Sequence, residues 1–542
     1  MKLSHVLLNA LKDHGAREIF GIPGDFALPF FREIERSKIL PLYTLSHEPA
    51  VGFAADAAAR YRSSLSVAAV TYGAGGLNMV NPTAQAYAEK SPVVVISGAP
   101  GAAEGQTGLG LHHQAKTLGS QFEIYKEVTC AQAILNDAAT APSEIARVLR
   151  TCLELSRPVY IEFPRDMVKA ESKAVAPYIS RPDDSEAAQA CAREVLSVLR
   201  KAERPALMLG VEVRRYGLEQ KVGRLAKLLR IPTGTSFMAR GILAGTDTPM
   251  IGTYLGLAGD EAVRETIEGA DALLLLGVIL CDTNFGVSGK LIDQRRMIHA
   301  FDRRVAFGHH VYPGVTLAAL VDAMLTLAKP IGKSVARDVA DYPHGLAHDD
   351  SEILPEDVAR AVNDLFAAKG VMPIASDMGD CLFTAMDIVY TELVAPAYYA
   401  TMGPGVPMGL GLQVASGLRP LIMVGDGAFQ MTGWELGNCR RLGLNPIVLL
   451  MNNTSWGMLK AFQSDTGYND LDDWRFADMA ASLGGKGMRV ATKRAFWDAL
   501  LAAHADESRW QMIEIMLPRG AFSRTLSRFI AAAKKLSVLG RD

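Results

Sequence analysis

Two short polar motifs in the last third of the chain could together bind a metal ion and a phosphate group. The first reads GDG at 425–427, between the apolar run LIMV and a helical pattern, and the second reads NNTS at 452–455, after the apolar run IVLLM. A glycine turn at a helix N-terminus offers free backbone N–H groups and a positive dipole end to an anion. Aspartate and asparagine supply the oxygen ligands that Mg²⁺ takes alongside phosphate oxygens and water.

Each motif alone also has an ordinary structural explanation, since GDG can be a tight turn and NN can cap the end of a strand. The 24 residues between the motifs fit one helix and one strand. This spacing places both motifs at the same edge of neighbouring parallel strands, where open α/β sheets bind their ligands. We therefore predict one site at which Mg²⁺ holds a phosphate or diphosphate.

The first third of the chain carries a second group of candidate catalytic residues. His112 and His113 follow the glycine-rich stretch GAAEGQTGLGL, Asp25 ends the sequence GIPGD, and Glu48 lies between a strand-like run and a helix rich in small residues. Imidazole titrates near neutral pH and can pass protons in both directions. The alternatives are a histidine that is structural, an aspartate that is a turn residue, and a carboxylate that is simply favoured at a helix N-terminus.

The elements that must position these residues are short apolar runs ending in Gly, Pro or Asp, separated by segments of helix length. Examples are REIFGIPGD at 17–25, VAAVTYGAGG at 67–76 and PLIMVGDGAF at 420–429. The runs are rich in β-branched residues and too short for buried helices. The pattern predicts α/β folding in doubly wound, parallel-sheet domains. The longest apolar run, 272–281, is half a membrane span and is better explained as a buried strand.

Two polar stretches, at 168–187 and 329–353, interrupt this pattern. Their composition is typical of linkers crossed by few contacts. We therefore predict three domains, at 1–172, 185–330 and 350–542. The central domain lacks a G-x-G-x-x-G motif, so its sequence does not predict a flavin or nicotinamide cofactor.

Length and composition restrict the classes of protein to consider. The 542 residues exceed what one hydrophobic core serves, and 49% hydrophobic with 21% charged residues is typical of a folded protein. With 56 Lys and Arg against 58 Asp and Glu, the net charge is −2, so we expect neither nucleic acid nor a membrane as a partner. The six scattered cysteines favour a reducing compartment, and the first 15 residues read as an amphipathic helix. We expect a cytoplasmic protein.

The GDG and NN pair resembles the diphosphate motif of thiamine diphosphate enzymes. Essentially the whole chain resembles the 2-oxo acid decarboxylase branch of that family, and within it the phenylpyruvate and indolepyruvate decarboxylase group. The resemblance implies the thiamine diphosphate-binding fold, with a pyrimidine-binding, a central and a diphosphate-binding domain. It also implies an active site between the first domain of one subunit and the third domain of another, so a homodimer is the minimum assembly and a homotetramer is common.

The resemblance further implies a role for each candidate residue. The implied Mg²⁺ ligands are Asp426, Asn453 and the backbone oxygen of Ser455, and the implied cofactor contacts are Gly425, Gly427, Ala428, Asp380, Ala400 and Met402. Glu48 would donate to the pyrimidine ring and so help to generate the carbon nucleophile of the cofactor. His112, His113 and Asp25 would form the relay that supplies a proton after CO₂ leaves. Acetohydroxy-acid synthases lack this histidine pair.

Two positions depart from relatives in the family. Met402 aligns with the bulky residue that bends the cofactor, although methionine is also a common core residue, and Pro404 stands where family members often carry Phe. Pyruvate decarboxylases place a catalytic glutamate six residues after the metal-binding asparagine, where this chain has Leu459. An apolar residue there resembles the phenylpyruvate group.

The implied substrate pocket is correspondingly apolar. Its lining by resemblance is Thr71, Phe383, Leu459 and Phe462. Aromatic walls suit an aryl side chain, and a pocket poor in water favours loss of CO₂. The same aromatic residues could equally be ordinary core.

These observations lead to one leading hypothesis and two alternatives. The leading hypothesis is a decarboxylase that uses thiamine diphosphate and Mg²⁺ to convert phenylpyruvate or indole-3-pyruvate to the aldehyde and CO₂, which would connect it to indole-3-acetic acid synthesis. One alternative is another thiamine diphosphate enzyme, either a carboligase or a pyruvate or branched-chain decarboxylase. The other is a catalytically silent protein that binds the cofactor. A C-terminal amphipathic helix, RTLSRFIAAAKKLSVLG, could close over the active site.

Overall fold

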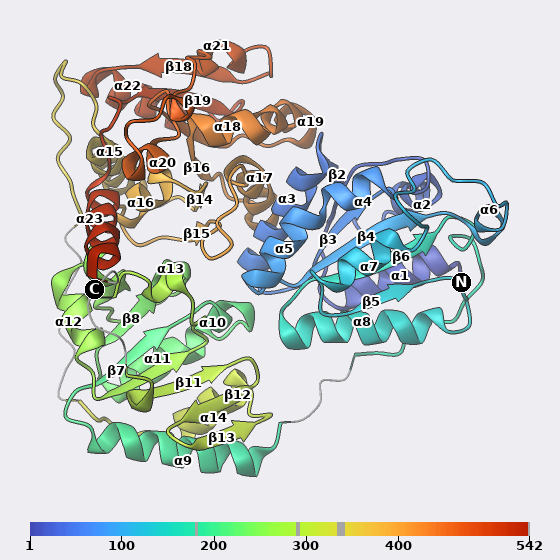
Figure 1. Cartoon of the computed structure of the whole chain (residues 1–542), viewed down its shortest axis with the longest axis horizontal. Helices are drawn as coiled ribbons and strands as arrows, with labels where there is room; N and C mark the ends of the chain where they lie inside the picture. Colours follow the sequence, from blue (N-terminus) through green and yellow to red (C-terminus); the bar gives the residue numbers. More distant parts are fainter. Residues whose placement is uncertain (179–182, 289–292, 333–341, 540–542) are drawn as a thin grey trace.

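The chain folds into three α/β domains, each built on its own sheet. The computed structural model describes residues 1–178, 183–288, 293–332 and 342–539. Parts of both predicted linkers, 179–182 and 333–341, and Gly540 at the end of the predicted C-terminal helix lie outside the described residues. Figure 1 shows the first domain in blue and cyan beside the third in yellow to red, with the green central domain adjoining the third.

The first domain has a six-stranded parallel sheet in the order β2-β1-β3-β4-β6-β5. Its strands are β1 (Ile19–Gly21), β2 (Leu42–Thr44), β3 (Ser66–Val70), β4 (Val93–Ala99), β5 (Gln132–Ile134) and β6 (Val159–Pro164). Its helices are α1 (Leu3–Asp13), α2 (Leu28–Ser37), α3 (Glu48–Arg62), α4 (Ala74–Asn78), α5 (Val80–Ala88), α6 (Ala102–Gly105), α7 (Ser120–Lys126) and α8 (Ala141–Leu155). The amphipathic helix predicted at the N-terminus is confirmed, since α1 buries Leu3, Val6 and Leu7.

The central domain has a seven-stranded sheet in the order β13-β12-β11-β10-β7-β8-β9. Its strands are β7 (Pro205–Leu209), β8 (Thr233–Ser236), β9 (Gly252–Tyr254), β10 (Ala272–Leu276), β11 (Met297–Phe301), β12 (Arg304–Phe307) and β13 (His310–Pro313). Its helices are α9 (Ser185–Lys201), α10 (Glu212–Arg215), α11 (Glu219–Leu229), α12 (Glu261–Glu268), α13 (Asp282–Phe285) and α14 (Leu317–Leu327), with 3-10 turns η1 (Phe237–Ala239), η2 (Gly256–Ala258) and η3 (Gln294–Arg296). The buried strand predicted within 272–281 is β10.

The three predicted parallel-sheet domains are confirmed, and the central sheet adds an antiparallel edge that the sequence did not predict. Strands β11, β12 and β13 pair antiparallel. The two residues between β11 and β12, Asp302 and Arg303, both have positive φ, at 53° and 59°. A two-residue turn of this conformation matches the twist of adjacent strands and so forms a hairpin, whereas a parallel connection needs a long crossover.

The third domain repeats the first, with a six-stranded parallel sheet in the order β15-β14-β16-β17-β19-β18. Its strands are β14 (Ile374–Ser376), β15 (Leu393–Val394), β16 (Leu421–Gly425), β17 (Ile447–Asn452), β18 (Lys486–Val490) and β19 (Gln511–Met516). Its helices are α15 (Pro355–Lys369), α16 (Asp380–Met386), α17 (Gly405–Ser416), α18 (Asp426–Thr432), α19 (Cys439–Leu442), α20 (Gly457–Phe462), α21 (Phe476–Ala480), α22 (Lys493–Ala505) and α23 (Arg524–Leu539), with 3-10 turns η4 (Gly433–Asn438) and η5 (Gly467–Asn469).

Both faces of these sheets are buried, as a doubly wound sheet requires. In β3, Ala68 and Val70 belong to one hydrophobic cluster, while Val67 and Ala69 belong to another on the opposite face. The same alternation occurs in β16 of the third domain. One cluster is common to the first and third domains, so these two domains share a core.

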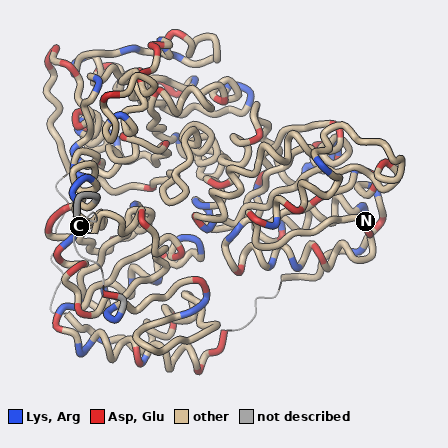
Figure 2. Tube along the Cα trace, viewed as in Figure 1, with Lys and Arg blue, Asp and Glu red and all other residues tan. Residues whose placement is uncertain are grey.

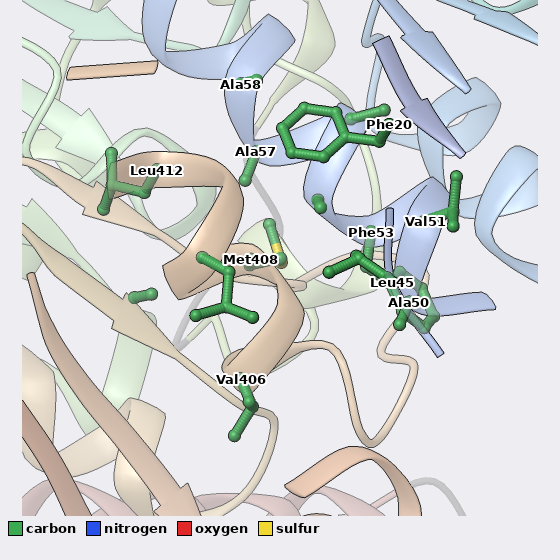
Figure 3. Close-up of a cluster of buried hydrophobic side chains, with 14 of the residues drawn as sticks. Phe20, Leu45, Ala50, Val51, Phe53, Ala57, Ala58, Val406, Met408 and Leu412 are labelled. Atoms are coloured by element: carbon green, nitrogen blue, oxygen red, sulfur yellow. The ribbon is translucent and has the colours of Figure 1, made fainter. Parts of the chain in front are cut away.

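The shared core is centred on the packing of α3 against α17 (Figure 3). Figure 3 shows Ala50, Val51 and Phe53 of α3 together with Val406 and Met408 of α17. The helices approach closely because their facing residues are small. A Cβ atom on Gly411 would lie 2.1 Å from the backbone oxygen of Ala54, so glycine is required there.

The single helix predicted after the GDG turn is instead broken into α18, η4 and α19. The break coincides with Gly433 and Gly437, which are poor helix formers. It also coincides with Glu435, which is buried and accepts the backbone N–H of Ser46 at 2.9 Å. The third-domain chain therefore bends where it meets the start of α3.

Residues of both charges are interspersed over all three domains in Figure 2. This distribution fits the net charge of −2. Among the helices that the structure describes, none combines the length and apolar character that a bilayer crossing requires.

Candidate active site

The two motifs of the last third meet in one pocket of the third domain, at the carboxyl ends of β14, β16 and β17. The backbone N–H of Ser455 donates to Asp426 Oδ2 at 3.2 Å, which joins NNTS to GDG. The pocket has a volume of about 270 Å³. Its lining includes the predicted residues Asp380, Ala400, Met402, Gly425, Asp426, Gly427, Ala428, Asn453, Ser455 and Leu459.

The pocket fits a metal-bound diphosphate by two of its features. Asn453 Oδ1 is buried and has no hydrogen-bond partner among the described residues, so an oxygen ligand is free for a cation. A Cβ atom on Gly427 would lie 2.4 Å from the Trp456 ring, whereas Gly425 faces open space.

Burial raises the pKa of Asp426 to about 6, and its backbone hydrogen bonds only partly offset that rise. A bound cation would reverse that shift.

The neighbouring asparagine has a different surrounding. Asn452 donates to Glu514 Oε1 at 2.7 Å and accepts the backbone N–H of Thr454 at 3.0 Å. Its side chain is thus held in the interior of the domain, while Asn453 lines the pocket. Of the two asparagines, Asn453, the predicted Mg²⁺ ligand, lines the pocket and Asn452 does not.

Asp377 is a residue of this site that the sequence analysis missed. It follows β14, is completely buried, and accepts the backbone N–H groups of Gly403 at 2.9 Å and Gly405 at 2.7 Å. Burial raises its pKa to about 6. It thereby fixes the loop that carries Ala400 and Met402 over the pocket. The signal for it in the sequence was an aspartate at a strand end, in the run IASD.

Two non-glycine residues of the predicted site, and Thr454 beside the predicted metal ligands, have left-handed backbone conformations. They are His113 with φ of 66°, Ala400 with φ of 58° and Thr454 with φ of 51°. A β-branched residue such as Thr454 rarely adopts this conformation. Residues held in such conformations concentrate at functional sites because the surrounding structure determines them. Sequence patterns alone do not show this property.

Asp380 connects the pocket to the C-terminal helix α23. Its Oδ2 accepts the backbone N–H of Ser523 at 2.9 Å, just before that helix begins. Its Oδ1 is buried and unpaired within the part of the chain that the structure describes. Burial raises the pKa of Asp380 to about 6.

A second, apolar cavity of about 380 Å³ adjoins the first. Both cavities are lined by Met378, Ala400 and Met458. Phe383 stands in its wall, with ring centroids 5.9 Å from Phe237 of the central domain and 5.1 Å from Phe529 of α23. We call this cavity the aromatic chamber. Of its two predicted partners on α20, Leu459 lines the first pocket, and Phe462 is 47% exposed and lines neither cavity.

The remaining predicted residues gather in the first domain. His112 Nε2 is hydrogen-bonded to Asp25 Oδ2, and His113 Nε2 lies 3.6 Å from Asp25 Oδ1. The His112 ring stacks on Phe26 at a centroid distance of 4.8 Å. Burial alone would raise the pKa of Asp25, but the hydrogen bonds from His112 and the Phe26 backbone, together with the charges of the two histidines, outweigh it and the pKa is lowered. The three ligand-type atoms lie within 4.8 Å of one another.

Glu48 and Thr71 lie at the same edge of the first sheet. Asn78 Nδ2 donates to Glu48 Oε2 at 3.0 Å. A Cβ atom on Gly75 would lie 3.1 Å from Thr71 Cγ2 and 3.5 Å from Glu48 Oε1, so both side chains face one small space. Thr71 Oγ1 is buried and has no partner among the described residues.

The two groups of residues do not share a cavity within one chain. The described residues that line the third-domain pocket all come from 378–522, and those of the aromatic chamber from the central and third domains. Asp25, Glu48, Thr71 and the histidines line neither. Within one chain the two groups therefore lie apart, and we call them the first-domain half-site and the third-domain half-site.

Comparisons with known proteins find relatives for all three domains. Residues 1–124 match the family description "Thiamine pyrophosphate enzyme, N-terminal TPP binding domain", residues 192–329 match its central domain, and residues 377–515 match its C-terminal TPP binding domain. The chain is 58% identical to the indole-3-pyruvate decarboxylase of Azospirillum brasilense, over 100% of both chains. It is 29% identical to an alpha-keto-acid decarboxylase of Mycobacterium bovis, over 97% of this chain and 96% of that one.

A solved structure shares the fold. The thiamine diphosphate-dependent 4-hydroxybenzoylformate decarboxylase of Rhodococcus jostii RHA1 superposes with a TM-score of 0.79, over 97% of this chain and all of that chain, at 19% identity. Matches to all three parts of the family, together with a relative 58% identical over its full length, establish the relationship. The chain belongs to the thiamine pyrophosphate enzymes, in their branch of 2-oxo acid decarboxylases.

Proposed function

We propose that this protein removes CO₂ from aryl 2-oxo acids, phenylpyruvate or indole-3-pyruvate, and releases the aldehyde. The observation that carries the proposal is the full-length identity of 58% with an indole-3-pyruvate decarboxylase. The aromatic chamber beside the cofactor pocket supports it, since about 380 Å³ accommodates an aryl side chain. Turnover of indole-3-pyruvate would connect the protein to indole-3-acetic acid synthesis.

The third domain supplies the residues that would hold the cofactor and metal. Asp426, Asn453 and the backbone oxygen of Ser455 would ligate Mg²⁺, which would bind the diphosphate against Gly425, Gly427 and Ala428. Ala400 and Met402 would contact the other end of the cofactor. Thiamine diphosphate, when bound, supplies the nucleophilic carbon and accepts the electron pair that CO₂ leaves behind.

Glu48 would exchange a proton with the cofactor's pyrimidine ring. The position suits this role because Asn78 orients the carboxyl group through Oε2, leaving Oε1 towards the small space beside Gly75 and Thr71. Such a positioned proton donor typically contributes a factor of about 10² to 10⁴ in rate.

Asp25, His112 and His113 would deliver the proton that replaces the carboxyl group. The reaction consumes one proton for each CO₂ released, at the carbon that becomes the aldehyde. Asp25 orients His112 through their hydrogen bond, and His113 Nε2 lies 3.6 Å from the same carboxylate. The exposure of both histidines within one chain leaves them accessible to a half-site from another chain.

The aromatic chamber would exclude water from the carboxylate that is lost. Phe237, Phe383 and Phe529 form its aromatic wall, and Leu459 stands at the rim of the adjoining pocket. An apolar residue at 459 fits a substrate whose side chain is an aromatic ring. Thr71 would reach the substrate from the first domain.

We infer that two chains complete each active site, so a homodimer is the minimum and a homotetramer is the expected assembly. Large apolar side chains near the third-domain pocket support this inference by their exposure: Tyr398, Met431, Trp434, Phe462, Tyr468 and Trp474 are each more than 40% exposed. Of these, the rings of Trp434 and Trp474 lie side by side with centroids 6.4 Å apart, and exposed apolar side chains in such contact are typical of an interface. The six free cysteines fit a reducing compartment, so we place the protein in the cytoplasm.

The decisive experiment supplies thiamine diphosphate and Mg²⁺ and compares CO₂ release from phenylpyruvate, indole-3-pyruvate, pyruvate and benzoylformate. We expect the two aryl pyruvates to have the largest kcat/KM. A preference for pyruvate would refute the interpretation of Leu459 and the aromatic chamber. Hydroxy ketone as the main product would favour the carboligase alternative, and binding of the cofactor without turnover of any substrate would favour a catalytically silent protein.

A further inference from the structure

We propose that Gln121 is a positioning residue that holds the loop carrying His112 and His113 in its working geometry. This inference rests on the proposed role of the two histidines. It concerns a buried hydrogen-bond network behind the first-domain half-site. The network reaches the histidines through the backbone of the TYGAGG turn at 71–76 and of residue 118.

Gln121 is 2% exposed and lies in α7, the helix that begins where the histidine loop ends. Both the oxygen and the nitrogen of its side-chain amide form hydrogen bonds. Gln121 Oε1 accepts the backbone N–H of Gly73 at 2.7 Å. Gln121 Nε2 donates to Ser97 Oγ at 2.9 Å and to Tyr160 Oη at 2.5 Å. Three separate elements, the turn after β3, strand β4 and strand β6, are thus joined by one amide.

Gly73 is the point where this network meets the histidine loop. A Cβ atom on Gly73 would lie 2.0 Å from the backbone oxygen of His113, so the turn and the loop are in direct contact there. A Cβ atom on Gly76 would lie 2.3 Å from Gln121 Oε1. The backbone at 73–76 is therefore tightly packed between His113 on one side and Gln121 on the other.

Two tyrosines reinforce the same junction. Tyr72 Oη donates to the backbone oxygen of Leu118 at 2.9 Å, and Tyr125 Oη donates to the backbone oxygen of Gly76 at 2.7 Å. The turn at 71–76 is thus bonded to both the loop end and α7. Behind Gln121, Tyr160 Oη donates to Glu162 Oε1 at 2.9 Å, which fixes the tyrosine hydroxyl that receives the Gln121 amide.

This arrangement explains how His113 keeps its left-handed backbone, with φ of 66°. A non-glycine residue stays in that conformation only where its surroundings determine it. Loss of the Gln121 amide would leave the N–H of Gly73 buried without a partner and release the turn from α7. The histidines would then sample positions away from the carbon that must receive the proton.

The test compares Gln121→Met with Gln85→Met in the full-length holoenzyme. Methionine has the length of glutamine without its hydrogen bonds. Gln85 is equally buried in the same domain, and donates to Asp56 Oδ2 at 2.8 Å, so its replacement controls for a general loss of stability. The first measurement is amide hydrogen exchange over 106–117 without substrate. We expect faster exchange in the Gln121 variant only.

The second measurement is the fate of phenylpyruvate in the presence of excess benzaldehyde. A misplaced proton donor lets the aldehyde acceptor compete with protonation, so the ratio of hydroxy ketone to phenylacetaldehyde should rise. We expect kcat for phenylacetaldehyde to fall about 10- to 100-fold with a smaller change in KM, as is typical of a displaced catalytic group. Cofactor affinity should stay within about twofold of the parent, since Gln121 and its hydrogen-bond partners do not line the third-domain pocket. Tyr160→Phe should give the same changes in weaker form.

Unchanged loop exchange in Gln121→Met would overturn the proposal, as would an unchanged product ratio. Equal changes in Gln85→Met would also overturn it, because the effect would then be one of general stability. If the parent protein releases no CO₂ from any substrate, the proposed function fails, whereas the exchange measurement still decides the role of Gln121 in the loop.

Discussion

The two half-sites differ in how their polar atoms are hydrogen-bonded. In the third-domain pocket, Asn453 Oδ1 and Asp380 Oδ1 are buried and unpaired within the described residues. In the first domain, Asp25 is paired with His112 and Glu48 with Asn78, while both histidines are exposed. One half is a pocket with buried, unpaired oxygens, and the other is a set of groups with exposed histidines.

This difference indicates how each half is completed. Buried unpaired oxygens cost free energy that a bound cation would recover, so the third-domain half depends on its ligand. In the first-domain half, the carboxyl groups of Asp25 and Glu48 already have hydrogen-bond partners, and Thr71 Oγ1 is the buried oxygen without one among the described residues. Since the first-domain half lines neither the cofactor pocket nor the aromatic chamber of its own chain, we propose that it faces the pocket of a second chain.

The largest effect should follow replacement of the carboxyl group in the first half. Glu48→Gln keeps the shape and the hydrogen bond from Asn78 but removes the proton, so turnover of phenylpyruvate should fall at least about 10³-fold. Thermal unfolding and cofactor affinity should be those of the parent. Near-normal turnover would show that the first half does not activate the cofactor.

A smaller effect should follow removal of a ligand in the second half. Asp426→Ala deletes a carboxylate that only a cation would neutralise, so Mg²⁺-dependent binding of thiamine diphosphate should weaken about 100-fold by calorimetry. Turnover should recover in part at high Mg²⁺ and cofactor concentrations. The Glu48→Gln variant is the matched control, since its third-domain pocket is intact, and an unchanged affinity in Asp426→Ala would remove this residue from the metal site.

The network behind the first half predicts a pH effect on stability. Burial raises the pKa of Glu162 from 4.5 to about 7. A raised pKa means that the folded state binds the proton more tightly, so this group contributes stability that is present below pH 4.5 and lost as pH rises through 7. The contribution is about 3 kcal/mol at most. Glu162→Gln should therefore raise the unfolding temperature at pH 8 and leave it unchanged near pH 4.5; a shift of equal size at both pH values would contradict this assignment.

Much of the site could be predicted from sequence because its residues lie at strand ends. A buried parallel strand followed by glycine or aspartate has few alternatives, and the meeting of GDG with NNTS follows from the order of neighbouring strands. The same reasoning placed Asp25 and Glu48 at the edge of the first sheet. Local pattern and tertiary position agree at these residues.

Other features depend on contacts that no local pattern contains. Asp377 and Gln121 act through backbone N–H groups of residues 26 to 48 positions away. The break in the helix after Asp426 depends on Glu435 meeting Ser46 of another domain. The antiparallel edge of the central sheet rests on two non-glycine residues, Asp302 and Arg303, in a conformation that their types do not indicate.

The comparison of the two half-sites is sharpest in a mixture of two defective chains. At limiting Mg²⁺ and cofactor, neither the Glu48→Gln nor the Asp426→Ala protein should be active alone, because every active site of its homodimer lacks one of the two carboxyl groups. In a mixed dimer, one site combines both defects, while the other joins the intact first domain of one chain to the intact third domain of its partner. Random 1:1 co-assembly yields mixed dimers in half of the molecules, so the activity should return to about a quarter of the parent value. If each site were built within one chain, every site would carry a defect and mixing would restore nothing. Assay of the co-expressed, doubly tagged dimer therefore decides whether each active site combines the first-domain and third-domain half-sites of one chain or of two.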